Sequence, residues 1–261
     1  MLPLLACGPA RAADPFKNVT CEGTYRQHLQ GVCTDEKGSI FWCFTDVLVK
    51  TDPEGRVVKK IPVASHHGDL CYYNGKLYVA VNLGQFNNPQ GKADSWVYVY
   101  RADDLAEVAR HKTPEVVYGA GGIAYHDRHF IVIGGLPIGV DENYAYEYDG
   151  EFRFIKRHVI KSGYTLMGIQ TAAYSGGFWW FGCYGKPQVL LKTDESFRLV
   201  GKYTFDCSLG IVGLVDGNFL VARGKYLPGK GHTASVVVAQ ADPTKGLMIR
   251  QSGLTPLRPI K

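Results

Sequence analysis

The sequence lacks the features that mark several large classes of protein. Beyond the N-terminus, no apolar run approaches 18 residues, so no membrane-spanning segment is expected. The 29 lysine and arginine residues are scattered, without a run of five or a block of basic and aromatic residues, and the net charge is only +5. We therefore expect no nucleic-acid partner.

Short catalytic and metal-binding motifs are also missing. The chain contains no GxSxG, HExxH, phosphate-binding loop, CxxC or Cys/His zinc spacing, so no reaction can be assigned from a motif. Helical periodicity is confined to a few residues around Asp103. What the chain does have is 12% aromatic residues and 31 glycines, which favour strands and turns.

An internal repeat accounts for most of the chain. Five hydrophobic strands have similar surroundings: SIFWCF (39–44), KLYVAV (76–81), HFIVIG (129–134), FWWFGC (178–183) and NFLVAR (218–223). Each is followed by a further strand that ends in an aspartate turn, at Asp52, Asp103, Asp149, Asp194 and Asp242. Because an aspartate at a turn bonds its own backbone, we expect these five to be structural. Repeated units of four antiparallel strands predict an all-β, single five-bladed β-propeller.

The repeat also sets the expected domain boundaries. The propeller covers 28–251, with blades at about 28–64, 65–116, 117–163, 164–206 and 207–251. Residues 14–27 form either a lead-in or a strand that closes the ring, and 252–261 form a tail. We expect a monomer.

The first 13 residues are interpreted as a targeting segment. A short apolar stretch ends in Ala10-Arg11-Ala12, a small-x-small pattern typical of a signal-peptide cleavage site, although the stretch is short enough to suggest a truncated start. Leu4-Leu5-Ala6-Cys7 also resembles a lipoprotein leader, which would attach a lipid to Cys7. Export to the periplasm or the extracellular space is therefore predicted.

Six cysteines remain once Cys7 is set aside: Cys21, Cys33, Cys43, Cys71, Cys183 and Cys207. In an oxidising compartment an even number of cysteines is typical of disulfides, and six allow 15 pairings. Buried free thiols in strands are the alternative, because a free cysteine packs as a small apolar residue.

The innermost strand of each blade should line the central channel. These strands are expected at HLQGVC (28–33), HHGDLC (66–71), AGGIAY (120–125), GIQTAAY (168–174) and SLGIVG (208–213). Adjacent side chains on a strand face opposite ways, so only one of His66 and His67 can point inward. We expect His67, because it precedes Gly68 as Gln30 precedes Gly31.

The HLQG and HHGDL blocks resemble those of an uncharacterised family of secreted bacterial β-propellers, over most of the chain. The resemblance implies a five-bladed propeller and export, and implies no activity.

Polar residues near the axis are the candidate ligand-binding set: His28, Gln30, His67, Asp69, Asn82, Gln170 and Arg223. Imidazole, amide and carboxylate groups suit sugar hydroxyls, and His28, His67 and Gln170 could instead hold one divalent ion such as Ca, Mn or Zn. Arg223 would favour an anionic ligand. The alternative is that these side chains only satisfy one another around channel waters.

Three functions follow from this set. The first is the binding of a small polar ligand, with carbohydrate as the expected class. The second is a metal-assisted polysaccharide lyase or glycoside hydrolase, whose catalytic candidates are Tyr184, Lys225 and Asp69. Asp69 is the one inner-strand acid, which argues against a glycosidase carboxylate pair. The third is a protein-interaction scaffold without channel chemistry.

Overall fold

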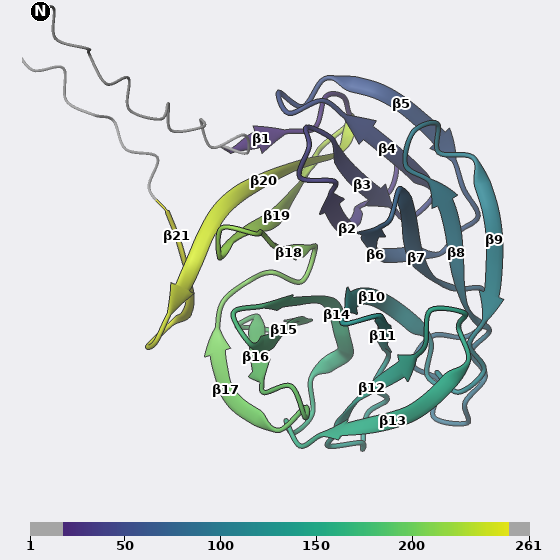
Figure 1. Ribbon diagram of the computed structural model, residues 1–261, viewed down its shortest axis with the longest axis vertical. Helices are drawn as coiled ribbons and strands as arrows, with labels where there is room; N and C mark the ends of the chain where they lie inside the picture. Colours follow the sequence, from purple (N-terminus) through teal and green to yellow (C-terminus); the bar gives the residue numbers. More distant parts are fainter. Residues whose placement is uncertain (1–17, 251–261) are drawn as a thin grey trace, which may run out of the picture.

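The computed structural model describes residues 18–250, and the described chain forms five antiparallel sheets arranged as the blades of a propeller (Figure 1). In the first four blades, strand order from the axis to the rim follows the chain. Blade one contains β2 (Leu29–Thr34), β3 (Ile40–Phe44), β4 (Val47–Thr51) and β5 (Val57–Pro62); blade two contains β6 (His67–Tyr73), β7 (Lys76–Asn82), β8 (Ser95–Arg101) and β9 (Glu107–Lys112). Blade three contains β10 (Ala120–His126), β11 (His129–Gly134), β12 (Asn143–Tyr148) and β13 (Phe154–Ile160); blade four contains β14 (Leu166–Ser175), β15 (Phe178–Tyr184), β16 (Val189–Thr193) and β17 (Leu199–Thr204). The predicted fold class is confirmed.

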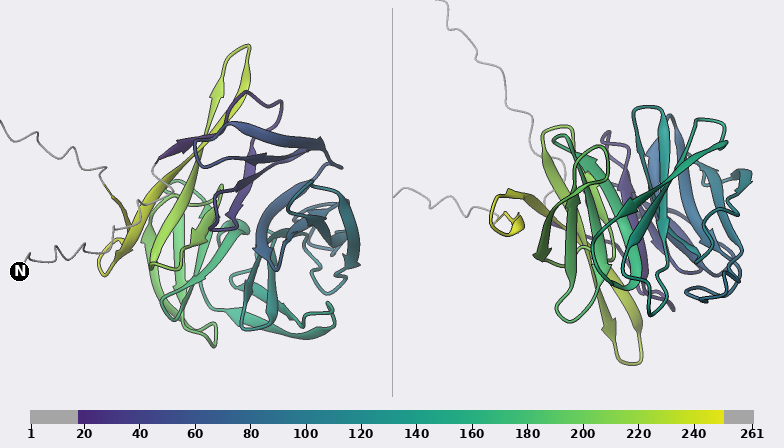
Figure 2. Two further views of the ribbon diagram at one scale, coloured as in Figure 1. Left: turned by 45° about the horizontal axis from the view of Figure 1, so that its top comes forward. Right: turned by 90° about the horizontal axis from the view of Figure 1, so that it is seen from below.

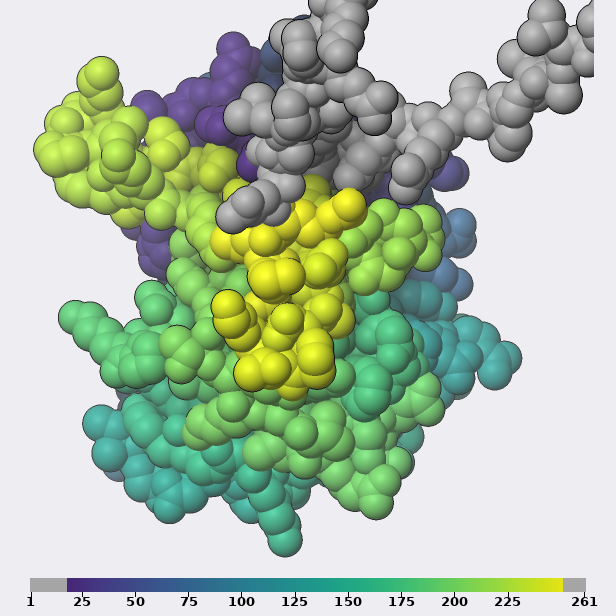
Figure 3. All heavy atoms as spheres, turned by 90° about the vertical axis from the view of Figure 1, so that its left-hand side faces the viewer, coloured from purple at the N-terminus to yellow at the C-terminus, as the bar shows by residue number. Residues whose placement is uncertain are grey.

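Blade five is closed by both ends of the described chain. Its first three strands are β18 (Ile211–Gly213), β19 (Asn218–Leu227) and β20 (Gly231–Asp242). The outer edge of β20 pairs with β1 (Val19–Thr20) along one part and with β21 (Gly246–Ile249) along another. Figure 3 shows β21 in yellow on the outside of the ring, where Gly246 packs closely against the Tyr203 ring of blade four. β1 therefore adds a strand that closes blade five.

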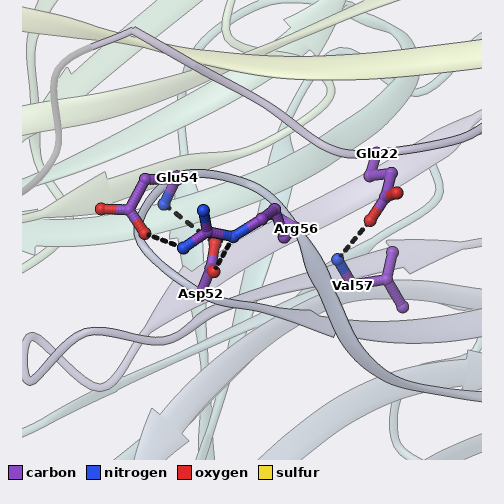
Figure 4. Close-up of polar contacts among 5 residues, drawn as sticks. All are labelled: Glu22, Asp52, Glu54, Arg56 and Val57. Carbon is purple, nitrogen blue, oxygen red and sulfur yellow. Dashed lines mark hydrogen bonds and ion pairs between the residues drawn. The ribbon is translucent and has the colours of Figure 1, made fainter.

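The segment that follows β1 also ties blade five to blade one (Figure 4). The backbone N–H of Glu22 donates to the carbonyl of Gly55 at 2.9 Å, and the Glu22 carboxylate accepts the backbone N–H of Val57 at 2.8 Å. Gly55 has φ +86°, and a Cβ there would lie 2.0 Å from the carbonyl oxygen of Thr20. Only glycine fits this crossing.

The turn aspartates have the structural role expected of them in four blades. In blade one, Asp52 Oδ1 accepts the backbone N–H groups of Glu54 and Arg56 at 3.0 and 2.9 Å (Figure 4). Asp149, Asp194 and Asp242 accept backbone N–H groups in the same way. In blade two the residue is Asp104 and not Asp103, since Asp104 accepts the N–H of Ala106 at 3.0 Å.

The core lies between the blades. At each interface between neighbouring blades, large apolar side chains of one sheet pack on those of the next. Phe41 and Leu48 of blade one, for example, pack with Val79 and Tyr98 of blade two. Strands that are buried on both faces read as continuous apolar runs, which explains sequences such as FWWF.

The six cysteines of the described residues are free thiols, so the predicted disulfides are not formed. Five are buried and Cys71 is half-buried. They are spread over different blade interfaces: Cys21 packs between blades five and one, Cys183 between blades three and four, and Cys207 between blades four and five. The alternative interpretation, that they are small apolar core residues, therefore fits the structure. Cys7 and the predicted targeting segment lie outside the described residues.

Ring closure can be tested at β1. Val19 is buried and pairs with Val236, whereas neighbouring Thr20 is exposed and pairs with Ser235. Val19→Asp should lower the free energy of unfolding by about 3 kcal/mol, because it buries an unpaired charge. The control, Thr20→Asp, should change it by less than about 1 kcal/mol. Urea unfolding followed by tryptophan fluorescence measures both, and equal losses would contradict a closing role for β1.

Candidate ligand-binding site

The centre of the channel is filled by one carboxyl group. Asp69 of β6 is buried, and its Oδ2 accepts the backbone N–H of Ala172 on β14 at 3.3 Å. The amides of Leu70 and of Val32, on β2, also act on this carboxyl group. A Cβ on Gly31 would lie 2.3 Å from Asp69 Oδ1, so the missing side chain at Gly31 makes the space that the carboxyl group occupies.

Burial decides the protonation of Asp69. Desolvation raises its pKa well above the usual value, and the backbone amides of Leu70, Ala172 and Val32 oppose this only in part. Its Oδ1 has no hydrogen-bond partner among residues 18–250. Asp69 was a predicted ligand-binding and catalytic residue. The structure places it inside the strand packing and not among the residues that line a cavity.

Asp69 lies between two cavities at opposite ends of the channel. Gly31 on β2, Asp69 on β6 and Thr171 on β14 mark the middle of the channel. One cavity is lined by the residue before each of them, Gln30, Gly68 and Gln170. The other cavity is lined by the residue after each of them, Val32, Leu70 and Ala172.

The second cavity is the larger, at 470 Å³, but its two carboxylates are already engaged by backbone N–H groups. Asp35 Oδ1 accepts the backbone N–H groups of Lys37, Gly38 and Ser39. Glu36 accepts the backbone N–H of Val215 at 3.0 Å. We therefore take the first cavity as the candidate site.

The candidate site is a cavity of 260 Å³, which we call the axial pocket. It is lined by His28, Gln30, His66, Gly68, Phe86, Gly121, Met167, Gln170 and Tyr184. No aspartate, glutamate, lysine or arginine is in this lining. The volume is slightly below the range of about 300–1,000 Å³ typical of drug-sized ligands, so the pocket has room for one small molecule or one unit of a longer chain.

Gln30 is the hub of the polar side of the axial pocket. Its Nε2 lies 3.0 Å from His28 Nε2 and 2.8 Å from His66 Nε2, and Thr45 Oγ1 is the more distant neighbour of this nitrogen, at 3.3 Å. An amide that donates to both rings fixes both as neutral imidazoles protonated on Nδ1. Burial lowers the pKa of both His28 and His66, which also favours the neutral rings.

The expectation that His67 faces the axis is wrong, and His66 takes this place. Leu29 pairs with Phe44 and His67 pairs with Val81, the equivalent position of the next blade. His67 thus occupies the site of a buried apolar residue, whereas His66 corresponds to His28 and Gly68 to Gln30. The sequence comparison aligned Gly68 with Gly31, whereas the strand pairing aligns Gly68 with Gln30. This shift of one residue pointed the wrong histidine inward.

His67 is fully buried within its blade. Its Nε2 pairs with the hydroxyl of Tyr100 at 2.8 Å and its Nδ1 with the carbonyl of Ala64 at 2.5 Å. Burial lowers its pKa to about 4. With both nitrogens engaged, His67 has no free position for a ligand or a metal, and the predicted metal set of His28, His67 and Gln170 does not come together.

Four predicted residues line the axial pocket: His28, Gln30, Gln170 and Tyr184. Gln170 Nε2 donates to the carbonyl of Met167 at 2.7 Å, which leaves its second amide hydrogen and its carbonyl oxygen for a ligand. Burial raises the pKa of Tyr184 to about 12, so this phenol is a hydrogen-bond donor at neutral pH and a poor base.

The other predicted residues are engaged elsewhere. Asn82 holds the base of the 83–94 loop, since it donates to the carbonyl of Gly84 and accepts the N–H of Asp94. Arg223 Nη1 donates to the carbonyls of Asp206 and Ala222 at 2.6 and 3.0 Å. Lys225 is exposed on β19, outside the pocket lining.

Phe86 and Met167 line the pocket and were not predicted. Phe86 comes from the loop 83–94 and reaches across to blade three, where Gly119 leaves room for its ring. The length of this loop suggested that it borders a pocket, but nothing in the sequence selects Phe86 among its residues. Met167 has a left-handed backbone, with φ 61°, which no local motif indicates.

Five blades around a central axis, with a cavity at one mouth, define a five-bladed β-propeller. No helix among residues 18–250 is long and apolar enough to cross a membrane. No family model and no curated protein matches the sequence, so membership of the secreted bacterial family remains a prediction.

Solved structures support the fold. The chain is similar to Myxococcus xanthus glutaminyl cyclase, with a TM-score of 0.58, 13% identity, and coverage of 86% of this chain and 98% of that one. It is also similar to the WD40 repeats of RRP9 (TM-score 0.54, 10% identity, 90% and 83% coverage). A third is a protein of unknown function from Bacteroides caccae (TM-score 0.51, 11% identity, 78% and 82% coverage). At these identities the likeness concerns the fold alone.

The role of Asp69 gives a prediction on stability and pH. Its pKa is higher in the folded protein than the value of about 4 in an unfolded chain. The folded state therefore holds the proton more tightly, and the Asp69 contribution to stability is complete below pH about 4 and declines as pH rises toward the raised pKa. Asp69→Asn cannot titrate, so the stability of the wild type relative to this variant should fall with increasing pH.

Urea unfolding between pH 4 and 8 measures this difference. Asp69→Ala is the companion variant and should cost about 1–3 kcal/mol, because it leaves the N–H of Ala172 without its acceptor. If the stability of the wild type relative to Asp69→Asn rose with pH instead, the pKa of Asp69 would be lower in the folded protein than in the unfolded chain, and Asp69 would be ionised there.

Proposed function

We propose that the axial pocket binds one uncharged polar unit, and that this unit is a sugar ring. The observation that carries the proposal is the lining itself. Two amides, two neutral imidazoles and a phenol supply donors and acceptors on the same pocket that presents Phe86 and Met167. A sugar ring is likewise divided into a polar and an apolar part, with hydroxyls at its edge and C–H groups on its face.

The charge of the lining selects against anionic ligands. Arg223 is tied to backbone carbonyls, and no lysine or arginine lines the pocket. A carboxylate brought into it would lose its hydration without gaining a cation, which is costly. We therefore replace the expectation of an anionic ligand with that of a neutral sugar. Such a ligand agrees with the predicted export, which we retain as part of the proposal.

Calorimetry with glucose, galactose, mannose and N-acetylglucosamine, beside glucuronate and galacturonate, tests the proposal. We expect a neutral sugar to bind and its uronate to bind at least tenfold more weakly. Tyr184→Phe, which removes only a hydroxyl, and Gln170→Ala should each weaken binding about tenfold, as for the loss of one buried hydrogen bond.

Lys37→Ala, at the opposite mouth of the channel, is the matched control and should bind as the wild type does. A peptide with N-terminal glutamine joins the panel because of the likeness to glutaminyl cyclase. Binding of this peptide without any sugar, or equal binding of uronates, would contradict the proposal.

A metal-assisted reaction at the same pocket is the second candidate. His28 Nε2 and His66 Nε2 approach a common point at the Gln30 amide, and imidazole nitrogens with an amide oxygen are ligands for Zn or Mn. The fit is incomplete, since no group of three or more His, Cys, Asp or Glu side chains in residues 18–250 is arranged to hold an ion. The Gln30 amide itself fills the space between the rings.

Metal analysis of the purified protein separates the two candidates. The hydrogen-bonded Gln30 hub predicts less than 0.1 equivalent of Zn, Mn or Ca. His28→Ala and His66→Ala should not change this content, and His129→Ala on blade three is the control. Near-stoichiometric metal that is lost in the first two variants and kept in the third would instead favour a metal-assisted lyase or hydrolase.

A further inference from the structure

A hairpin rises beside the mouth of the axial pocket. β19 and β20 stay paired from Asn218 and Gln240 as far as Leu227 and Gly231. They therefore run past the edge of the ring, and the hairpin projects from the molecule in both views of Figure 2, in yellow-green. The same hairpin is the projection at the upper left of Figure 3.

One face of this hairpin leads to the pocket. Tyr226 and His232 are directly opposite one another in the ladder, so their side chains share a face. Their ring centroids are 5.0 Å apart, and the His232 ring lies 6.0 Å from the His28 ring. Because His28 lines the axial pocket, Tyr226, His232 and His28 form a continuous row of rings that ends in the pocket.

Tyr226 has no packing role that explains it. Its side chain is 59% exposed, on a hairpin that already stands clear of the blades. Alternation along β19 points neighbouring Lys225 to the other face of the hairpin. An exposed aromatic ring beside a pocket with room for a single unit provides a flat apolar surface for whatever extends from that pocket.

We propose that the protein binds the end of an uncharged oligosaccharide, with the terminal sugar in the axial pocket and the following units along His28, His232 and Tyr226. This inference rests on the proposed function and names the form of its ligand: a chain end, not a free monosaccharide. Tyr226 stacks on the face of a following sugar, and His232 donates or accepts hydrogen bonds at its edge.

Dependence of affinity on chain length tests the inference. The probes are β-1,4-linked glucose and N-acetylglucosamine series of one to four units, measured by calorimetry. We expect the trimer of the bound series to bind at least tenfold tighter than its monomer. Tyr226→Ala should weaken trimer binding about tenfold and leave monomer binding unchanged. Lys225→Ala, on the opposite face of the same hairpin, should leave both unchanged.

The outcomes separate this inference from the proposed function. Monomer binding that Tyr184→Phe weakens, with no gain from chain length or no effect of Tyr226→Ala, would keep the sugar pocket and overturn the extended site. If no sugar binds, both fail. A length-dependent, Tyr226-dependent response to glutaminyl peptides and not to sugars would assign the row of rings to a peptide and overturn the oligosaccharide.

Discussion

The structure depends on how closely the innermost strands approach at the axis. Gly31 and Asp69 occupy equivalent positions on β2 and β6, and a Cβ on Gly31 would lie 2.5 Å from the Asp69 Cα. Strands this close leave no channel at that level. The carboxyl group of Asp69 fills the remaining space and connects β6 to the backbone of β14. An acidic group tolerates this position because burial raises its pKa and the neutral form carries a smaller desolvation cost.

This constraint determines where a ligand can bind. With Asp69 buried between the innermost strands, each mouth of the channel is a separate cavity. The axial pocket then depends on the residues one step before the constriction, Gln30, Gly68 and Gln170. Gly68 has no side chain because the carbonyl oxygen of Gly121 would lie 2.3 Å from its Cβ. The room for a ligand therefore follows from the same crowding that closes the channel.

Much of the fold could be predicted from the sequence, because five similar units repeat the same alternation of strands and turns. The site was harder, since it depends on single-residue register. A bulge lies between Leu29 and Gly31 in β2, and another between His67 and Leu70 in β6, and a bulge changes which side chains face the axis. Gln30, His28 and Gln170 were placed correctly because their strands were. His66 was missed because a glycine match gave the wrong offset, and Phe86 because a loop conformation decides its position.

The neutrality of the axial pocket is a consequence of its hydrogen-bond network. Gln30 can donate to His28 and His66 only while both Nε2 atoms are unprotonated, and burial makes protonation of either ring less favourable. Protonation of one ring would break its hydrogen bond with Gln30. It would also bury a charged imidazolium, away from water and next to a second histidine. Gln30, His28 and His66 are thus hydrogen-bonded to one another before a ligand arrives. A ligand gains from this arrangement by meeting groups that are already oriented, provided that it is itself uncharged and has hydroxyls or amides at the matching edge.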